Sequence, residues 1–262
     1  MFNHLSKLSL IVNLKSMVIA VIAVAATWAS IKFNIKADFP LTIISTAVIF
    51  PIVFSIGHAY KRREVTLDDY GTIKAHGRAI YFAARDWLPQ QSDDRLEHGR
   101  TALKHLMEAV RNLFKGNPKD MLENEKAVYA AFSELSEFIK RMRADGLPSG
   151  ECSRCNQYLS KMIISFEHAK HVYQYRTPRT LRAFSDLFIV ALPIIYGPYF
   201  AHEAADYHPW LAYVMPMLFA IILVGLDNIQ SHLEDPFDQI GPDDVSINAE
   251  KFVELLSSGE TA

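Results

Sequence analysis

The sequence predicts an all-α integral membrane protein with four transmembrane helices and a cytoplasmic helical bundle. Three observations predict this fold class. Apolar residues are concentrated in four stretches without Asp, Glu, Lys or Arg, a long charged block separates the second stretch from the third, and that block shows helical rather than strand periodicity. The four charge-free stretches are residues 16–31, 39–57, 187–201 and 209–226.

Each stretch is close to the length that crosses a bilayer. A hydrocarbon core of about 30 Å needs about 20 helical residues at about 1.5 Å per residue. The third stretch is the shortest, and Pro193 and Pro198 interrupt it. We therefore expect this span either to extend into its flanking residues or to lie partly within protein.

Basic residues mark one side of the predicted spans. Lys and Arg follow the second stretch at 61–63 and precede the third between 176 and 182, whereas the loop 202–208 has neither. Because cytoplasmic loops are enriched in Lys and Arg, the central block and both termini are predicted to be cytoplasmic, in a multi-pass protein of the plasma membrane or bacterial inner membrane. The predicted organisation is an N-terminal segment with transmembrane helices 1 and 2 in 1–60, a helical block in 61–180, transmembrane helices 3 and 4 in 181–232, and an acidic segment with a helix in 233–262.

Three apolar stripes at helical spacing run through the central block. They lie within residues 103–114, 128–142 and 159–173, and turn-forming Gly, Asn, Asp and Pro separate them. Charged residues occupy the opposite faces. The stripes therefore predict the core of a helical bundle rather than a chemical site.

Composition disfavours several classes of function. The net charge of −2 gives no basic face for nucleic acid. Cys152 and Cys155 form a lone C-x-x-C without the further ligands of a zinc site, so reduced thiols are expected. The loop 202–208 carries metal-ligand residue types, but an exposed polar loop explains it equally well. No catalytic motif is present, so we predict neither an enzyme nor a cofactor.

The second stretch carries a stripe suited to a pore. Thr46, Phe50 and Phe54 lie four residues apart and drift by only about 40 degrees per step around a helix. Phe side chains in a ring would form an apolar neck that gates by dewetting, with positive ring edges that favour anions. Phe facing lipid or packed in protein is the alternative. Small residues, which would allow close contact with another helix, lie off the stripe at Ser45, Ala47, Ser55 and Gly57.

Motifs along the chain resemble those of the bestrophin family. Residues 54–62, Phe-Ser-Ile-Gly-His-Ala-Tyr-Lys-Arg, are similar to the segment that ends the bestrophin pore neck. Residues 175–178 resemble the entry into the third span, and 233–237 with the acidic pair at 243–244 resemble the acidic motif after the fourth. The motif residues singled out by this resemblance are Tyr60, Arg62, Gly71, Arg78, Asp235, Pro236 and Phe237.

The resemblance implies a homopentamer with one axial pore in the lipid bilayer. Its neck would be lined by Thr46, Phe50 and Phe54, and small inorganic anions, chloride above all, would pass through it. A cation-selective channel of the same fold and a non-conducting membrane scaffold are the alternatives. The chain departs from the family at Thr46, usually aliphatic, and at 62–64, where Arg-Arg-Glu replaces the common Arg-Trp-Trp.

Two further sites follow from the resemblance. Ser153 falls near the second, cytoplasmic constriction of the family, although the usual apolar residues are absent there. The acidic segment after Pro236 is where animal members bind calcium through oxygen ligands. Asp238, Asp243 and Asp244 are fewer and differently spaced than in those members, so a solvated turn is favoured over a metal site.

Overall fold

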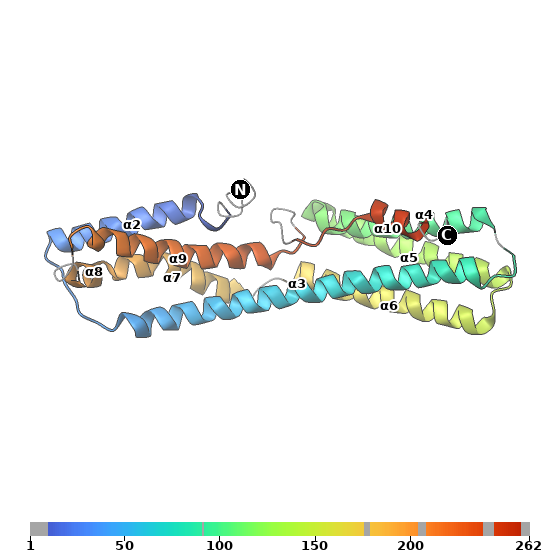
Figure 1. The fold of residues 1–262 in the computed structure, drawn as a ribbon, viewed down its shortest axis with the longest axis horizontal. Helices are drawn as coiled ribbons and strands as arrows, with labels where there is room; N and C mark the ends of the chain where they lie inside the picture. Colours follow the sequence, from blue (N-terminus) through green and yellow to red (C-terminus); the bar gives the residue numbers. More distant parts are fainter. Residues whose placement is uncertain (1–9, 91, 176–178, 204–207, 238–243, 258–262) are drawn as a thin grey trace. The chain divides into compact units, whose positions relative to one another are not determined.

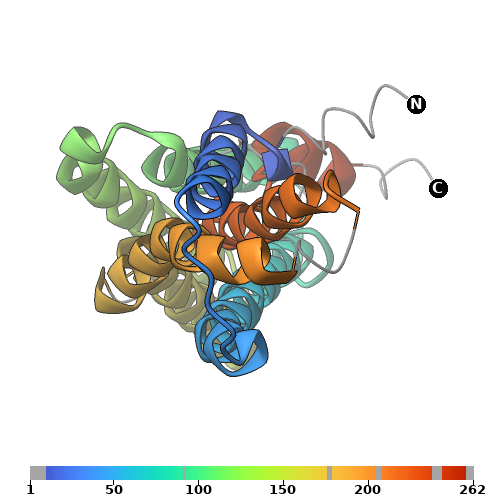
Figure 2. The ribbon, with the colours of Figure 1, turned by 90° about the vertical axis from the view of Figure 1, so that its left-hand side faces the viewer.

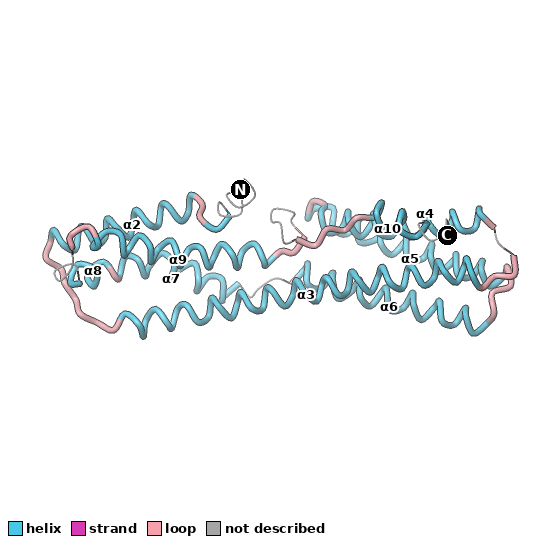
Figure 3. The backbone as a smooth tube through the Cα atoms, viewed as in Figure 1, coloured by secondary structure: helices cyan, strands magenta, loops and turns pink. Residues whose placement is uncertain are grey.

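The computed structural model describes residues 10–90, 92–175, 179–203, 208–237 and 244–257 (Figure 1). Within these ranges the chain consists of helices joined by turns and contains no strand (Figure 3). It divides into two compact units. The membrane unit comprises residues 1–61, 176–235 and 240–243, and the polar unit comprises 62–175, 236–239 and 244–262.

The membrane unit contains the apolar helices. Four segments are long and apolar enough to cross a bilayer, which confirms the predicted fold class. The second of them, Thr42–Asp86, begins within the charge-free stretch 39–57, which is about as long as a bilayer is thick, and its helix continues into the polar unit. The helices of this unit are α2 (Leu14–Lys32), the first part of α3 (Leu41–Asp86), α7 (Arg179–Ile195), α8 (Gly197–Glu203) and α9 (Leu211–Glu234).

The third span extends into both of its flanks. It runs over Arg182–Glu203, so the charge-free core of the stretch gains residues on each side, as its shortness required. A turn at Tyr196 separates α7 from α8, and Pro198 lies in the first turn of α8, where its missing N–H would have no helical partner. The proline therefore starts a new helix rather than interrupting one.

Small residues allow the first and third spans to pack closely. A Cβ atom at Gly197 would lie 3.0 Å from the carbonyl carbon and oxygen of Ala26 on α2. Ala20 and Ala23 of α2 are buried, and the end-on view shows α2 lying close to α8 and α9 (Figure 2). Without a hydrophobic driving force in lipid, such close contact is what holds helices together. Tyr196 fills the centre of this core and is fully buried.

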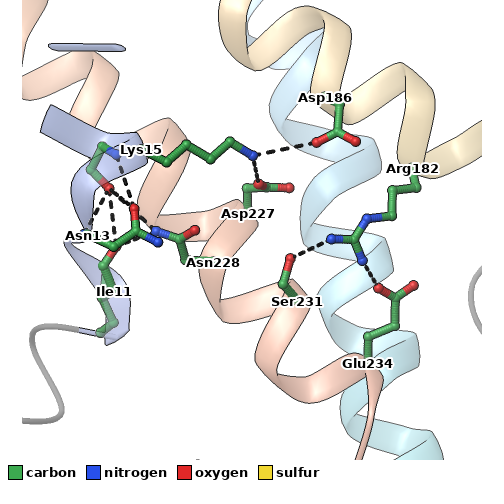
Figure 4. Close-up of polar contacts among 10 residues, drawn as sticks. Ile11, Asn13, Lys15, Arg182, Asp186, Asp227, Asn228, Ser231 and Glu234 are labelled. Atoms are coloured by element: carbon green, nitrogen blue, oxygen red, sulfur yellow. Dashed lines mark hydrogen bonds and ion pairs between the residues drawn. The ribbon is translucent and has the colours of Figure 1, made fainter. Parts of the chain in front are cut away.

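A polar network joins the start of α2 to α7 and α9 (Figure 4). The Lys15 ammonium donates to Asp227 Oδ2 at 2.7 Å and lies 3.5 Å from Asp186 Oδ1. The Asn228 amide donates to the carbonyl of Ile11 at 2.7 Å. The Asp227 side chain is only 4% exposed, so Lys15 neutralises a carboxylate that would otherwise be buried alone.

A second ion pair joins the start of α7 to the end of α9 (Figure 4). The Arg182 guanidinium pairs with Glu234 and donates to Ser231 Oγ at 3.0 Å. Glu234 is buried, whereas Arg182 is partly exposed. The two carboxylates that α9 buries therefore both have a cationic partner from another helix.

The polar unit buries the three predicted stripes. Its helices surround one core that contains Leu103, Phe132, Phe138 and Phe166, and the predicted bundle core is confirmed. Helices α4, α5 and α6 supply the stripes, with the second part of α3 beside them. Their bounds are α4 (Asp93–Lys115), the short helix η1 (Pro118–Asp120), α5 (Met121–Ala144), α6 (Ser149–Gln174) and α10 (Ala249–Ser257).

The segment after α9 completes this core. Phe237 is buried and stacks on Phe114 with ring centroids 4.1 Å apart. The Val245 N–H donates to the carbonyl of Pro236 at 2.7 Å. Phe252 of α10 is also buried. The sequence predicted a helix and an acidic segment here, but not that they supply core residues.

Both cysteines are packed in the polar core. Cys152 and Cys155 are free thiols on the buried face of α6, and the Cys152 Sγ lies 3.6 Å from the carbonyl of Leu147 as a donor. Burial is the main reason why the pKa of Cys155 is raised to about 11, and the nearby Cys152 and Glu151 raise it further. The protonated thiol therefore acts as a small apolar side chain.

Replacing Lys15 by Met is expected to destabilise the membrane unit, because the buried Asp227 carboxyl group loses its cationic partner. Breaking a buried ion pair costs about 3–5 kcal/mol, and about 1–3 kcal/mol is expected here because the Lys15 side chain is 42% exposed. Thermal unfolding of the detergent-solubilised protein should show a melting temperature lower by about 3–8 °C.

The matched control is Asp186→Asn, which removes the more distant and half-exposed partner of Lys15 and should leave the melting temperature within about 1 °C. The double variant K15M/D227N should recover most of the loss, since no charge remains buried. An unchanged melting temperature in K15M alone would contradict the assigned role of this pair.

The folded protein is expected to resist alkylation by iodoacetamide at pH 8. With a pKa of about 11, only about one Cys155 thiol in a thousand is ionised at that pH, and the side chain is buried. Because the pKa is raised, the reactive thiolate appears only as the pH approaches that value. The variant S153C places a thiol on the exposed face of the same helix and should react readily. Rapid modification of the unaltered chain would show that the two thiols on α6 are accessible and would contradict their burial.

Candidate pore-lining helix

Helix α3 presents two different faces within the membrane unit. One face packs against the unit's own helices, and Val48 and Ile52 on it belong to the buried core. The buried positions follow helical spacing at Ser45, Val48, Ile52, Ser55 and Ala59. Within the membrane unit, α3 therefore packs against its own chain through this face and not through the opposite one.

The opposite face carries the predicted stripe. Thr46, Phe50 and Phe54 are all exposed, and the two Phe residues are 57% and 59% exposed. Their rings meet edge to face, with centroids 5.4 Å apart and an interplanar angle of 61°. These three side chains therefore share one face of α3, as their spacing of four residues predicted. A pair of large apolar rings on the surface of one chain requires lipid or another protein surface as its neighbour.

Pro51 lies within α3 beside this stripe. Proline has no N–H, so the carbonyl of Ala47, one turn earlier, cannot receive its usual helical hydrogen bond. Ala47 is itself exposed. In a membrane such a carbonyl is tolerated where water or protein can reach it. This part of α3 therefore suits a hydrated cavity or a protein contact better than bare lipid.

The small residues of α3 divide between its two faces. Ser45 and Ser55 are buried against the same chain, so the close contact that they allow is with helices of their own chain. The spacing could not reveal this, because serine suits close packing within a chain as well as between chains. Ala47 and Gly57 remain exposed, and a Cβ atom at Gly57 would meet nothing within 4 Å.

Arg62 and Tyr60 have different surroundings. The Arg62 guanidinium donates to the carbonyl of Val172 at 2.9 Å, one of the last four carbonyls of α6. These carbonyls lack helical donors, so Arg62 caps α6 from α3. Tyr60 is exposed. Arg63 pairs with Glu64 at 2.5 Å, an ion pair in the place where the bestrophin pattern has two Trp residues.

The remaining motif residues belong to two other places. Gly71 and Arg78 line a hollow of about 570 Å³ formed by α3 and the segment around α10. Asp235 follows the last residue of α9, Pro236 is buried, and Phe237 enters the polar core. The motif after the fourth span therefore anchors the chain in the polar unit.

Ser153 lies on the exposed face of α6, away from the buried cysteines. It lines an open polar groove with Asn156, Gln157, Ser160 and Lys161. Its role at a second constriction stays a prediction. No sequence argument identified this groove, because its residue types are those of any solvated helix face.

The acidic and histidine-bearing segments form no metal centre in the part of the chain that the structure describes, where no three His, Cys, Asp or Glu residues gather. Asp238 and Asp243 lie outside the described residues, and Asp244 is partly exposed. In the loop 202–208, residues 204–207 also lie outside them, and His202 Nδ1 is 3.7 Å from Glu203 Oε1.

No protein-family model matches the sequence, and none of the curated protein sequences matches it. Solved structures do match. A crystal structure of a single-residue variant of a membrane protein aligns with a TM-score of 0.74 at 15% identity, covering 95% of this chain and all of that one.

Crystal structures of a bestrophin homologue from Klebsiella pneumoniae also align over most of both chains. One gives a TM-score of 0.70 at 16% identity, with 92% of this chain and 94% of that chain covered. A variant of the same homologue gives 0.71 at 16% identity, with 92% and 96% covered. The resemblance in the motifs is thus supported by the whole backbone, and the fold of this chain is that of the bacterial bestrophin homologues.

Proposed function

We propose that this protein is a bestrophin-like ion channel that conducts chloride or other small anions through the axis of a homopentamer. The observation that carries the proposal is the division of α3, with one face buried in its own chain and Phe50 and Phe54 exposed on the other. Around a five-fold axis these faces would enclose one pore, and their rings would form its narrow neck.

The chemistry of the stripe supports an anion pathway. An apolar ring constriction excludes water until it widens, and the edges of Phe rings carry partial positive charge. Thr46 adds a hydroxyl that donates a hydrogen bond to an anion at one end of the neck. Lys61 follows on the same helix, whereas Arg62 caps α6 and Arg63 pairs with Glu64. No acidic side chain lies in the charge-free part of α3.

The proposed orientation places the polar unit in the cytoplasm. Lys and Arg lie next to the spans on the side of the polar unit, and the loop 202–208 on the other side has none. The polar unit would then enclose a vestibule that concentrates ions before they reach the neck. Both termini would be cytoplasmic.

The double variant F50A/F54A is expected to raise the single-channel conductance or the open probability at least about twofold, because removal of the rings widens and wets the neck. Purified protein in planar bilayers gives the measurement. The matched control is Ile222→Ala, which removes a similarly exposed apolar side chain from α9. Currents that are the same in both variants and in the unaltered chain would place the Phe pair against lipid.

A KCl gradient across the bilayer tests the ion that is conducted. The reversal potential is expected to take the sign of the chloride equilibrium potential, because the proposed neck offers anions ring edges and hydroxyl donors. A reversal potential with the sign of the potassium equilibrium potential would show that the protein is a channel but selects cations. No current from the unaltered chain in any salt would favour a non-conducting membrane scaffold.

A further inference from the structure

A hollow in the polar unit collects positive charge. It has a volume of about 570 Å³ and lies where α3 meets the segment that leads into α10. Lys74 and Arg78 reach it from α3, and Lys251 reaches it from α10. None of the residues that line it is acidic.

Within the part of the chain that the structure describes, the three cations have no acidic partner. Among the described residues, no carboxylate forms an ion pair with Lys74, Arg78 or Lys251. Aromatic rings hold two of them instead. The Lys74 ammonium lies 4.2 Å from the centroid of the Tyr70 ring, and the Arg78 guanidinium lies 5.8 Å from that of Phe252.

Arg78 also leaves a buried donor unused. Its Nε is inaccessible to solvent and has no hydrogen-bond partner within the described part of the chain. A buried N–H without an acceptor costs free energy that the fold must offset. Arg111, another cation that contacts α10, does pair with an acid, Glu250, at 2.9 Å. At the hollow, by contrast, three positive charges lie together and no carboxylate among the described residues offsets them.

The start of α10 adds to the positive field. Asn248 caps the helix by accepting from the Lys251 N–H at 2.8 Å, and its own N–H donates to the Tyr70 hydroxyl at 3.2 Å. These bonds fix the helix terminus against α3. The N-terminal end of a helix carries partial positive charge and favours anions.

We propose that this hollow binds a small organic phosphate through Lys74, Arg78 and Lys251. Three cations attract a group with two negative charges. The planar guanidinium of Arg78 can also donate two parallel hydrogen bonds to phosphate oxygens. The volume leaves room for more than the phosphate, and the Tyr70 and Phe252 rings offer an apolar wall to the organic part. A phosphate monoester, free or on a lipid headgroup, carries the chemistry that this site recognises.

The test uses the full chain in detergent and measures thermal unfolding against added glucose 6-phosphate, with ionic strength held constant by NaCl. A ligand that binds the folded state alone raises the melting temperature as its concentration rises. We expect a saturable rise that glucose with NaCl does not reproduce. A rise in melting temperature with micelles that contain phosphatidylinositol 4-phosphate, but not with glucose 6-phosphate, would show that the ligand is a lipid headgroup. No rise with either ligand would overturn the proposal.

The double variant K74Q/K251Q provides the decisive comparison. Loss of two like charges should keep or raise its melting temperature without ligand, and should weaken binding by about tenfold or more for each charge removed. The matched control Lys140→Gln removes an exposed lysine that pairs only with Glu137 among the described residues, and should bind as the unaltered chain does. An undiminished rise in K74Q/K251Q would place the ligand elsewhere and overturn the site.

Discussion

The membrane unit depends on the neutralisation of buried carboxylate groups by cations from other helices. Asp227 and Glu234 are both buried on α9, and Lys15 and Arg182 reach them from α2 and α7. A carboxylate left alone in such a place would cost several kcal/mol, so a shift of α2 or α7 along α9 that separates these pairs is disfavoured. The close approach of Gly197 to the backbone of α2 occurs in the register that keeps the pairs. Helix α3 then packs one face on this frame and leaves its Phe face free.

Much of the fold could be predicted because it follows from local pattern. Charge-free stretches identify spans, and apolar stripes identify bundle cores, since both depend only on residue spacing. The side of α3 that carries Phe50 and Phe54 was predictable for the same reason. The pairing of Lys15 with Asp227 was not, because 212 residues separate them in the chain. The burial of Ser45 and Ser55 within their own chain was not predictable either, because small residues suit any close contact.

The two units treat charge in opposite ways. In the membrane unit the buried acids are paired, which is the arrangement expected of a structural network. In the polar unit Lys74, Arg78 and Lys251 share a hollow without an acid. The backbone matches bestrophin homologues at only 15–16% identity. Such low identity is compatible with one fold because a helical core tolerates many apolar substitutions as long as its volume and apolar pattern are kept.

The polar core can be completed only late in the synthesis of the chain. Phe237, Val245, Ile247 and Phe252 belong to this core, yet the ribosome adds them only after all four spans. The helices made from residues 93 to 174 therefore wait, with apolar surface uncovered, until the last span has emerged. A chain that stops before residue 237 would lack the ring that stacks on Phe114. Quality control that detects exposed apolar surface can thus remove truncated chains.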